Sequence, residues 1–75
     1  MTGPRISNNI RRLRFENGEM TQQQLAEKVG VTRQTVLAIE NAKYSPSLEL
    51  AFLIAQAFGV RLEDVFTFEP TNGAG

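Results

Sequence analysis

The sequence predicts an all-α domain built from five helices. Glycine and proline recur along the 75 residues at spacings that suit short helices, and the stretches between them are rich in helix-forming residues. Within those stretches, apolar residues repeat with the period of an amphipathic helix. A chain of this length has room for one domain, which we expect at about residues 5–70 with flexible termini at 1–4 and 71–75.

Composition argues against most catalytic and membrane functions. The chain contains no cysteine and no histidine, so it lacks disulfides, thiolates and the commonest general base and metal ligand. We expect no enzyme activity, no metal and no cofactor, and no small-molecule ligand is evident. The longest apolar run, Leu50–Ala55, is far shorter than the roughly 18 residues of a membrane span. The composition indicates a cytoplasmic protein with no membrane partner.

Charge is balanced overall but unevenly distributed. Eight basic side chains match eight acidic ones. Residues 1–43 carry seven of the basic and four of the acidic side chains, whereas residues 44–75 carry one and four. A basic first half can face phosphates while the acidic half stays away from them. Ordinary mixed surface charge explains the same distribution equally well.

The first helix is expected over about residues 8–17. Its apolar positions follow helical spacing, and they are Ile6, Ile10 and Leu13. Ser7 or Asn8 can accept a hydrogen bond from the unpaired amides at its start. Gly18 is expected to end it.

The second helix, about residues 22–29, has the clearest boundary signals. Thr21 and Gln24 fit a capping box, and the glycine that follows can adopt the left-handed conformation that closes a helix. Thr32 then caps a third helix at about residues 33–41.

A fourth helix is expected from Leu48 to Phe58, because Ser47 can cap it and a glycine follows it. We expect its core-facing residues to be Leu48, Ala51, Ile54, Ala55 and Phe58. A short fifth helix follows at residues 62–65. The next residues, 66–69, alternate apolar and polar side chains as a strand does.

The second and third helices together fit a helix-turn-helix unit. Apolar or small residues stand where such a unit needs them, namely Leu25, Ala26, Val29, Gly30, Val31, Val36 and Ile39. Ala26 is small where the two helices cross, and Gly30 allows the backbone to turn. A plain helical hairpin would rarely meet all these requirements, so the pattern predicts a DNA-reading motif.

Two runs resemble the Cro and lambda-repressor type of helix-turn-helix transcriptional regulator, also called the xenobiotic-response-element type. They are MTQQQLAEKVGVTRQTV at residues 20–36 and IENAKYSPSL at residues 39–48. The resemblance covers about residues 5–70 and implies a lambda-repressor-like fold. Residues 43–50 and 62–66 are similar to the short stand-alone bacterial members, including the cytolysin repressor, which lack a separate sensing domain.

The resemblance also raises two expectations about the ends of helices and strands. Many members have Asn-Gly-Lys after the third helix, but this chain has Asn41-Ala42-Lys43, so we expect Asn41 to take the left-handed role of the glycine. In the short members the C-terminal strand pairs with the segment before the first helix, here residues 5–7. A small two-stranded sheet would then join the two ends of the domain.

The resemblance implies that side chains early in the third helix read bases. Arg33 and Gln34 would enter the major groove, where arginine matches two acceptors of guanine and glutamine pairs with adenine. Ala38 can touch a thymine methyl group, and Leu37 is interpreted as a further groove contact. The alternative is that these are ordinary solvent-facing residues.

Other residues would position the protein without reading sequence. The implied phosphate contacts are Gln22, Thr32, Thr35, Asn41 and Lys43, although helix capping is sufficient to explain Thr32. In the family, an arginine late in the first helix meets a glutamate at the end of the third. Arg14 and Glu40 are therefore expected to form a partly buried ion pair, and the alternative is two surface charges that never meet.

The fourth helix is apolar nearly all round, which suggests that a partner covers part of it. A twofold homodimer is the economical explanation, since symmetric dimers place two reading helices on half-sites one turn apart. We expect the contact to use Phe52, Leu53, Leu62, Val65 and Phe66.

The sequence therefore predicts a regulator that binds double-stranded DNA sequence-specifically. Its simplest action is repression, by occupying a palindromic operator through the major groove as a homodimer. The alternative is an antitoxin or protein–protein adaptor with the same fold, and salt-dependent DNA binding would discriminate between the two.

Overall fold

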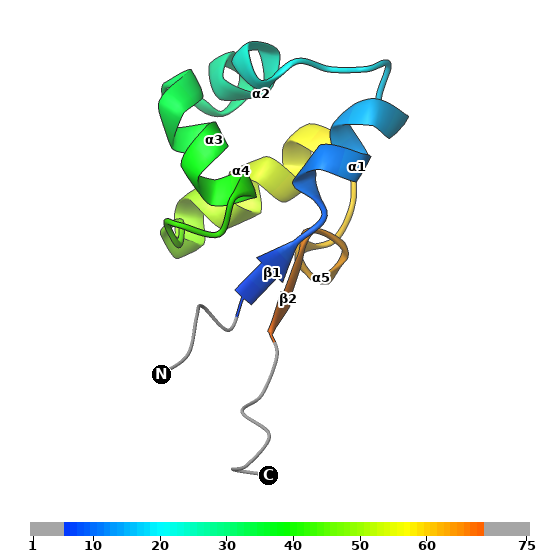
Figure 1. Ribbon diagram of the computed structural model, residues 1–75. Helices are drawn as coiled ribbons and strands as arrows, with labels where there is room; N and C mark the ends of the chain where they lie inside the picture. The colour runs from blue at the N-terminus through cyan, green and yellow to red at the C-terminus, as the bar shows by residue number, and fades with distance from the viewer. Residues whose placement is uncertain (1–5, 69–75) are drawn as a thin grey trace, which may run out of the picture.

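The computed structural model describes residues 6–68 and shows five helices and two short strands in this part of the chain (Figure 1). In chain order they are β1 (Ile6–Asn8), α1 (Ile10–Glu16), α2 (Gln22–Val29), α3 (Arg33–Glu40), α4 (Leu48–Phe58), α5 (Leu62–Val65) and β2 (Phe66–Phe68). The prediction of a five-helix domain is confirmed. The termini predicted to be flexible, 1–4 and 71–75, lie outside the described residues.

Local capping determines where α2, α3 and α4 begin. The Thr21 hydroxyl accepts from the amide of Gln24, whose side chain accepts in turn from the amide of Thr21, so the predicted capping box is complete. The hydroxyls of Thr32 and Ser47 cap α3 and α4 in the same manner. A left-handed glycine closes both α2 and α4.

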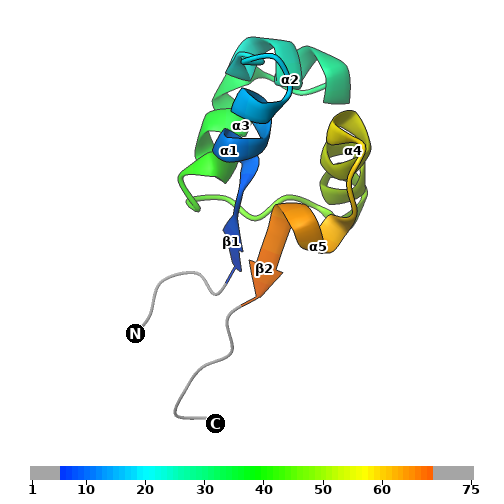
Figure 2. The same cartoon turned by 90° about the vertical axis from the view of Figure 1, so that its right-hand side faces the viewer.

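The helices surround one apolar core, with α2 packed against α3 and α4, and with α4 packed against α5. The largest side chains sealed inside it are Ile10, Leu25, Val36, Ile39, Ile54 and Val65. Two perpendicular views show that α2 lies at one end of the molecule and the two-stranded sheet at the other (Figures 1 and 2). The core therefore fixes which face of each helix is exposed.

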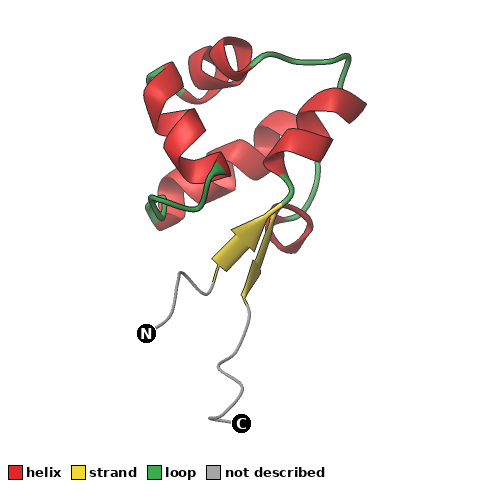
Figure 3. Ribbon diagram, in the orientation of Figure 1, coloured by secondary structure: helices red, strands yellow, loops and turns green. Residues whose placement is uncertain are grey.

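The two strands pair antiparallel and join the ends of the described chain (Figure 3). Ile6 lies opposite Phe68, and Asn8 lies opposite Phe66. The predicted sheet is confirmed, with residues 6–8 as its first strand. Residues 5, 69 and 70, which the prediction included in the domain, lie outside the described part.

The start of α1 differs from the prediction. The helix begins at Ile10 rather than near Asn8, because residues 6–8 extend along β2 instead. Ile6 is 37% exposed and does not belong to the apolar face of α1. Asn8 still assists the helix start, since its Oδ1 accepts from the amide of Ile10 at 3.1 Å.

The core face of α4 also differs from the prediction at its first turn. Leu48 is 68% exposed, so its assignment to the core was wrong, and Leu50 is buried in its place. The two positions lie about 200° apart around the helix. Leu50 falls on the stripe that Ile54 and Phe58 continue at four-residue spacing. Leu48 is the first residue of α4 and stays exposed, although Ala51 and Ala55 on its side of the helix are buried.

The left-handed residue after α3 is Ala42, with φ of 59°, and not Asn41, whose φ is −86°. The amides of Ala42 and Lys43 donate to the carbonyls of Ile39 and Ala38, at 3.0 and 2.9 Å. This double closure needs the positive φ one residue beyond Asn41. Alanine therefore occupies a conformation that glycine normally adopts.

Candidate nucleic-acid interface

A tight turn at residues 30–32 joins α2 to α3. Gly30 has φ of 81°, which a side chain would disfavour. The amides of Gly30 and Val31 both donate to the carbonyl of Ala26, at 2.8 and 3.0 Å, and Ala26 itself is fully buried. Because these small residues let the two helices approach closely, α3 packs one face on α2 and exposes the other.

The exposed face of α3 carries the predicted base-reading residues. Its opposite, buried face consists of Val36 and Ile39. Arg33 and Gln34 are exposed at the first two positions, Leu37 is 40% exposed, and Ala38 is half-buried. Within residues 6–68, neither Arg33 nor Gln34 takes part in a side-chain hydrogen bond or ion pair. Both side chains therefore face solvent.

The residues predicted to hold phosphates have different surroundings. The hydroxyl of Thr32 accepts from the amide of Thr35 at 3.2 Å and lies 3.1 Å from the Thr35 hydroxyl. Gln22 is half-buried, and its Nε2 donates to Glu40 Oε1 at 3.2 Å. Two others, Asn41 and Lys43, are exposed beyond the end of α3.

Arg14 and Glu40 lie in contact, as predicted. Arg14 Nε is 2.6 Å from Glu40 Oε2, and Arg14 Nη2 is 3.3 Å from Oε1. The two side chains are only 11% and 8% exposed. Arg14 Nη1 also donates to the carbonyl of Met20 at 2.8 Å. Since both buried charges have several polar partners, the pair can tie the end of α3 firmly to α1.

Two neighbours of this pair were not assigned to the site by the sequence. Asn8 Nδ2 donates to the carbonyl of Ile39, 31 residues away along the chain, at 2.9 Å. Phe15 is 55% exposed, with its ring centroid 6.0 Å from the Arg11 guanidinium and 5.9 Å from that of Arg14. The capping potential of Asn8 was visible locally, but no local pattern indicates its distant partner.

The surface predicted to form the dimer is only partly exposed. Phe52 and Leu53 are 50% and 38% exposed, while Leu62 and Phe66 are half-buried. Val65 is 0% exposed and belongs to the core, so its assignment to a dimer contact was wrong. Its side chain cannot touch a second chain unless the domain opens.

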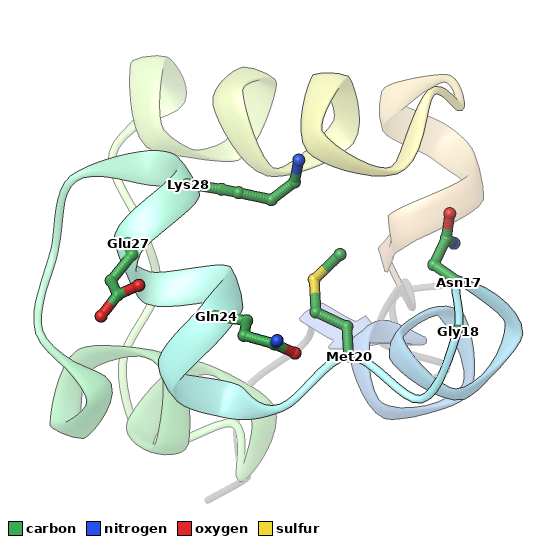
Figure 4. Close-up of a pocket in the computed structure, with 6 residues that line it drawn as sticks. All are labelled: Asn17, Gly18, Met20, Gln24, Glu27 and Lys28. Carbon is green, nitrogen blue, oxygen red and sulfur yellow. The ribbon is translucent and has the colours of Figure 1, made fainter.

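An open hollow of about 510 Å³ lies beside α2, lined by Asn17, Gly18, Met20, Gln24, Glu27 and Lys28. The Met20 and Lys28 side chains extend into it, from the loop before α2 and from α2 (Figure 4). This mixed set of side chains indicates no particular class of ligand.

Across residues 6–68, no cluster of acidic side chains could hold a metal ion, and no helix there is long and apolar enough to cross a membrane.

The fold and the exposed α3 face define a helix-turn-helix protein. The sequence pattern of the helix-turn-helix family matches residues 10–65, from the start of α1 to the end of α5. The chain therefore belongs to the helix-turn-helix family of Cro/C1 type. Members of this family are DNA-binding transcriptional regulators rather than enzymes.

Relatives in bacteria, archaea and phage agree with this assignment. The HTH-type transcriptional regulator YgzD of Bacillus subtilis is 49% identical over 67 residues, which cover 89% of this chain and all of YgzD. The regulator MJ0272 of Methanocaldococcus jannaschii is 60% identical over 50 residues, or 67% of this chain and 76% of that protein. The transcriptional repressor RstR of the cryptic phage CTXphi from Vibrio cholerae is 35% identical, over 89% of this chain and 60% of RstR.

Solved structures share the architecture. The hypothetical transcription factor NHTF from Neisseria has a TM-score of 0.67 and 29% identity, over 73% of this chain and 62% of NHTF. A Bacteroides fragilis protein has a TM-score of 0.74 over 83% of this chain and 98% of its own. Its identity is 24%, so it supports the fold alone.

Proposed function

We propose that the protein is a repressor that binds a palindromic operator in double-stranded DNA as a homodimer, with α3 of each copy in the major groove. The observation that carries this proposal is the exposed start of α3, where Arg33 and Gln34 make no polar contact within residues 6–68. Their side chains are those that pair bidentately with guanine and adenine. Such a regulator acts in the cytoplasm, where bacterial and archaeal DNA lies.

The proposed contacts divide into two groups. Arg33 and Gln34 read bases, and Leu37 and Ala38 add apolar contacts to the groove, because all four lie on the side of α3 away from its buried stripe. The backbone contacts are Gln22, Thr32, Thr35, Asn41 and Lys43. Of these, Lys43 supplies the positive charge that releases counterions from phosphate.

The proposed dimer uses the apolar surface of α4 and its neighbours. Phe52 and Leu53 are exposed on α4, with Leu62 and Phe66 half-buried nearby in sequence. One reading helix contacts only a few base pairs, so two copies on a palindrome multiply specificity. Repression is supported by the relative RstR, which is named as a transcriptional repressor.

Selection of bound sequences from a randomised duplex pool tests this function. We expect enrichment of one palindromic sequence, whose binding weakens steeply as salt is raised. Sedimentation equilibrium at micromolar concentration should give roughly twice the chain mass of 8.3 kDa. A mass near 8.3 kDa together with intact specific binding would contradict the proposed dimer. Absence of any enriched sequence would instead favour an antitoxin or adaptor.

A further inference from the structure

Asn8 joins three elements through one side chain. It is the last residue of β1, opposite Phe66 of β2. Its Oδ1 accepts from the amide of Ile10 at the start of α1, at 3.1 Å. Its Nδ2 donates to the carbonyl of Ile39 at 2.9 Å, and lies 3.5 Å from the carbonyl of Glu40, at the end of α3.

The contact with α3 supplies a hydrogen-bond donor to carbonyls at the end of that helix. The last carbonyls of any helix have no partner within it. In α3, the carbonyls of Ile39 and Glu40 are among these, and the half-buried amide of Asn8 approaches both. The carbonyl of Ile39 also accepts from the amide of Ala42 in the turn that follows the helix, so Asn8 is its second donor. Arg14 binds the side chain of Glu40 at the same end. Two side chains from the beginning of the chain therefore fix the last two residues of α3.

We propose that Asn8 is a positioning residue for the reading helix, setting the direction in which α3 presents Arg33 and Gln34 to DNA. This inference rests on the proposed function, because it assumes that these two side chains read bases. Asn8 itself touches no DNA in this proposal. It acts through the backbone of Ile39.

Distance along α3 amplifies a small change at its end. Arg33 precedes Ile39 by six residues, or about 9 Å of helix, so a tilt of about 6° at Ile39 moves the start of the helix by about 1 Å. A bidentate contact to a base edge tolerates only a few tenths of an ångström around its optimum. Contacts of flexible lysine side chains with phosphates tolerate more. Loss of the Asn8 contact should therefore reduce sequence discrimination more than general affinity.

Asn9 supplies a matched control one residue away. Its Nδ2 donates to the carbonyl of Asp64 in α5, at 3.2 Å and on the exposed surface. Its side chain makes no hydrogen bond to α3 within the described residues. Asn9→Asp and Asn8→Asp change the net charge equally, and each removes one amide donor.

The experiment compares Asn8→Asp and Asn9→Asp with the unmodified chain. In Asn8→Asp the retained oxygen still accepts from Ile10, and the new charge is favourable at the start of α1, but it repels the carbonyls of α3. Fluorescence anisotropy on the selected and a scrambled duplex should show about a tenfold fall in the affinity ratio for Asn8→Asp. Asn9→Asp should keep the ratio of the unmodified chain.

A second measurement works without DNA. Residual dipolar couplings of backbone amides report the orientation of α3 relative to α1, which should change in Asn8→Asp and stay constant in Asn9→Asp. Asn8→Ser serves the same purpose where the aspartate variant does not fold. An unchanged α3 orientation, or equal affinity ratios in the two variants, would overturn the positioning role. If the unmodified chain binds both duplexes equally, the proposed function is wrong. The dipolar couplings would then still show whether Asn8 sets the orientation of α3.

Discussion

Helices α3 and α4 both bury one face in the same core, yet their outer faces and their anchoring differ. α3 exposes Arg33 and Gln34 and is held at its end by polar side chains. α4 exposes Leu48, Phe52 and Leu53 and is held by apolar packing. Directional hydrogen bonds fix an orientation more narrowly than apolar contact does. The difference agrees with the roles proposed for them, in which α3 reads base edges and α4 packs against a second copy.

The largest loss of stability is expected from a substitution in the core beneath α4. Val65 is 0% exposed, so Val65→Asp places an unpaired carboxylate in the core and should cost about 4 kcal/mol or more, enough to unfold so small a domain. Leu53→Asp is the control, because Leu53 is 38% exposed and its variant should fold but fail to dimerise. Circular dichroism during heating shows which of the two variants is folded. A cooperatively folded Val65→Asp variant would refute the description of α4 as packed on a closed core.

The polar anchoring of α3 is tested by the Arg14–Glu40 pair. Removing either partner leaves the other charge buried, and we expect a loss of about 3 kcal/mol in the free energy of unfolding. The exposed pair Arg12–Glu16, with side chains 62% and 58% exposed, should contribute only about 0.3–0.5 kcal/mol. Double-mutant cycles in urea measure both couplings. Equal couplings would mean that the pair at α3 anchors nothing.

The outer face of α3 is tested by Arg33→Ala and Gln34→Ala. Each should lose about 1–3 kcal/mol of binding to the selected duplex and relax the preference at one base pair. Arg61→Ala removes the same kind of side chain as Arg33→Ala from an exposed position in the second half of the chain and should leave binding unchanged. Anisotropy on selected and scrambled duplexes measures all three variants. Equal losses on both duplexes would indicate phosphate contact alone.

The smallest effect concerns how the two helices end. α4 closes on Gly59, with φ of 70°, whereas α3 closes with Ala42 at φ of 59°. Ala42→Gly should therefore stabilise the fold by about 0.5–1 kcal/mol, because glycine adopts this conformation without strain. Ala57→Gly, inside α4, should destabilise it by a similar amount. Urea unfolding measures the change in the free energy of unfolding for both variants. A destabilised Ala42→Gly variant would show that Ala42 is not strained at this turn.

The sequence predicted the elements whose boundaries are set locally. Thr21 and Gln24 mark the start of α2, and Ser47 that of α4, because a capping side chain lies within three residues of the amide it binds. The family resemblance added the Arg14–Glu40 pair, which no local pattern indicates.

The errors arose where a distant partner decides the structure. Ile6 fits the helical spacing of α1, and only the family resemblance, not the local pattern, predicted its place in a strand opposite Phe68. Val65 was assigned to the dimer contact, but its side chain is buried in the core. The contact between Asn8 and Ile39 joins residues 31 positions apart, beyond the reach of any local signal. At the candidate site, the exposed residues of α3 and the Arg14–Glu40 pair at its end were predicted, whereas the contact of Asn8 with that end was not.

The pairing of Ile6 with Phe68 has a consequence for the order of folding. It closes a loop that contains nearly the whole domain, and the entropy lost on closure grows with loop length. A sheet of two strands adds little stability of its own, so we expect β1 and β2 to join only after the helices have assembled. The same strands should be the first to separate, and the amides of residues 6–8 should exchange with solvent before those of α2 and α4.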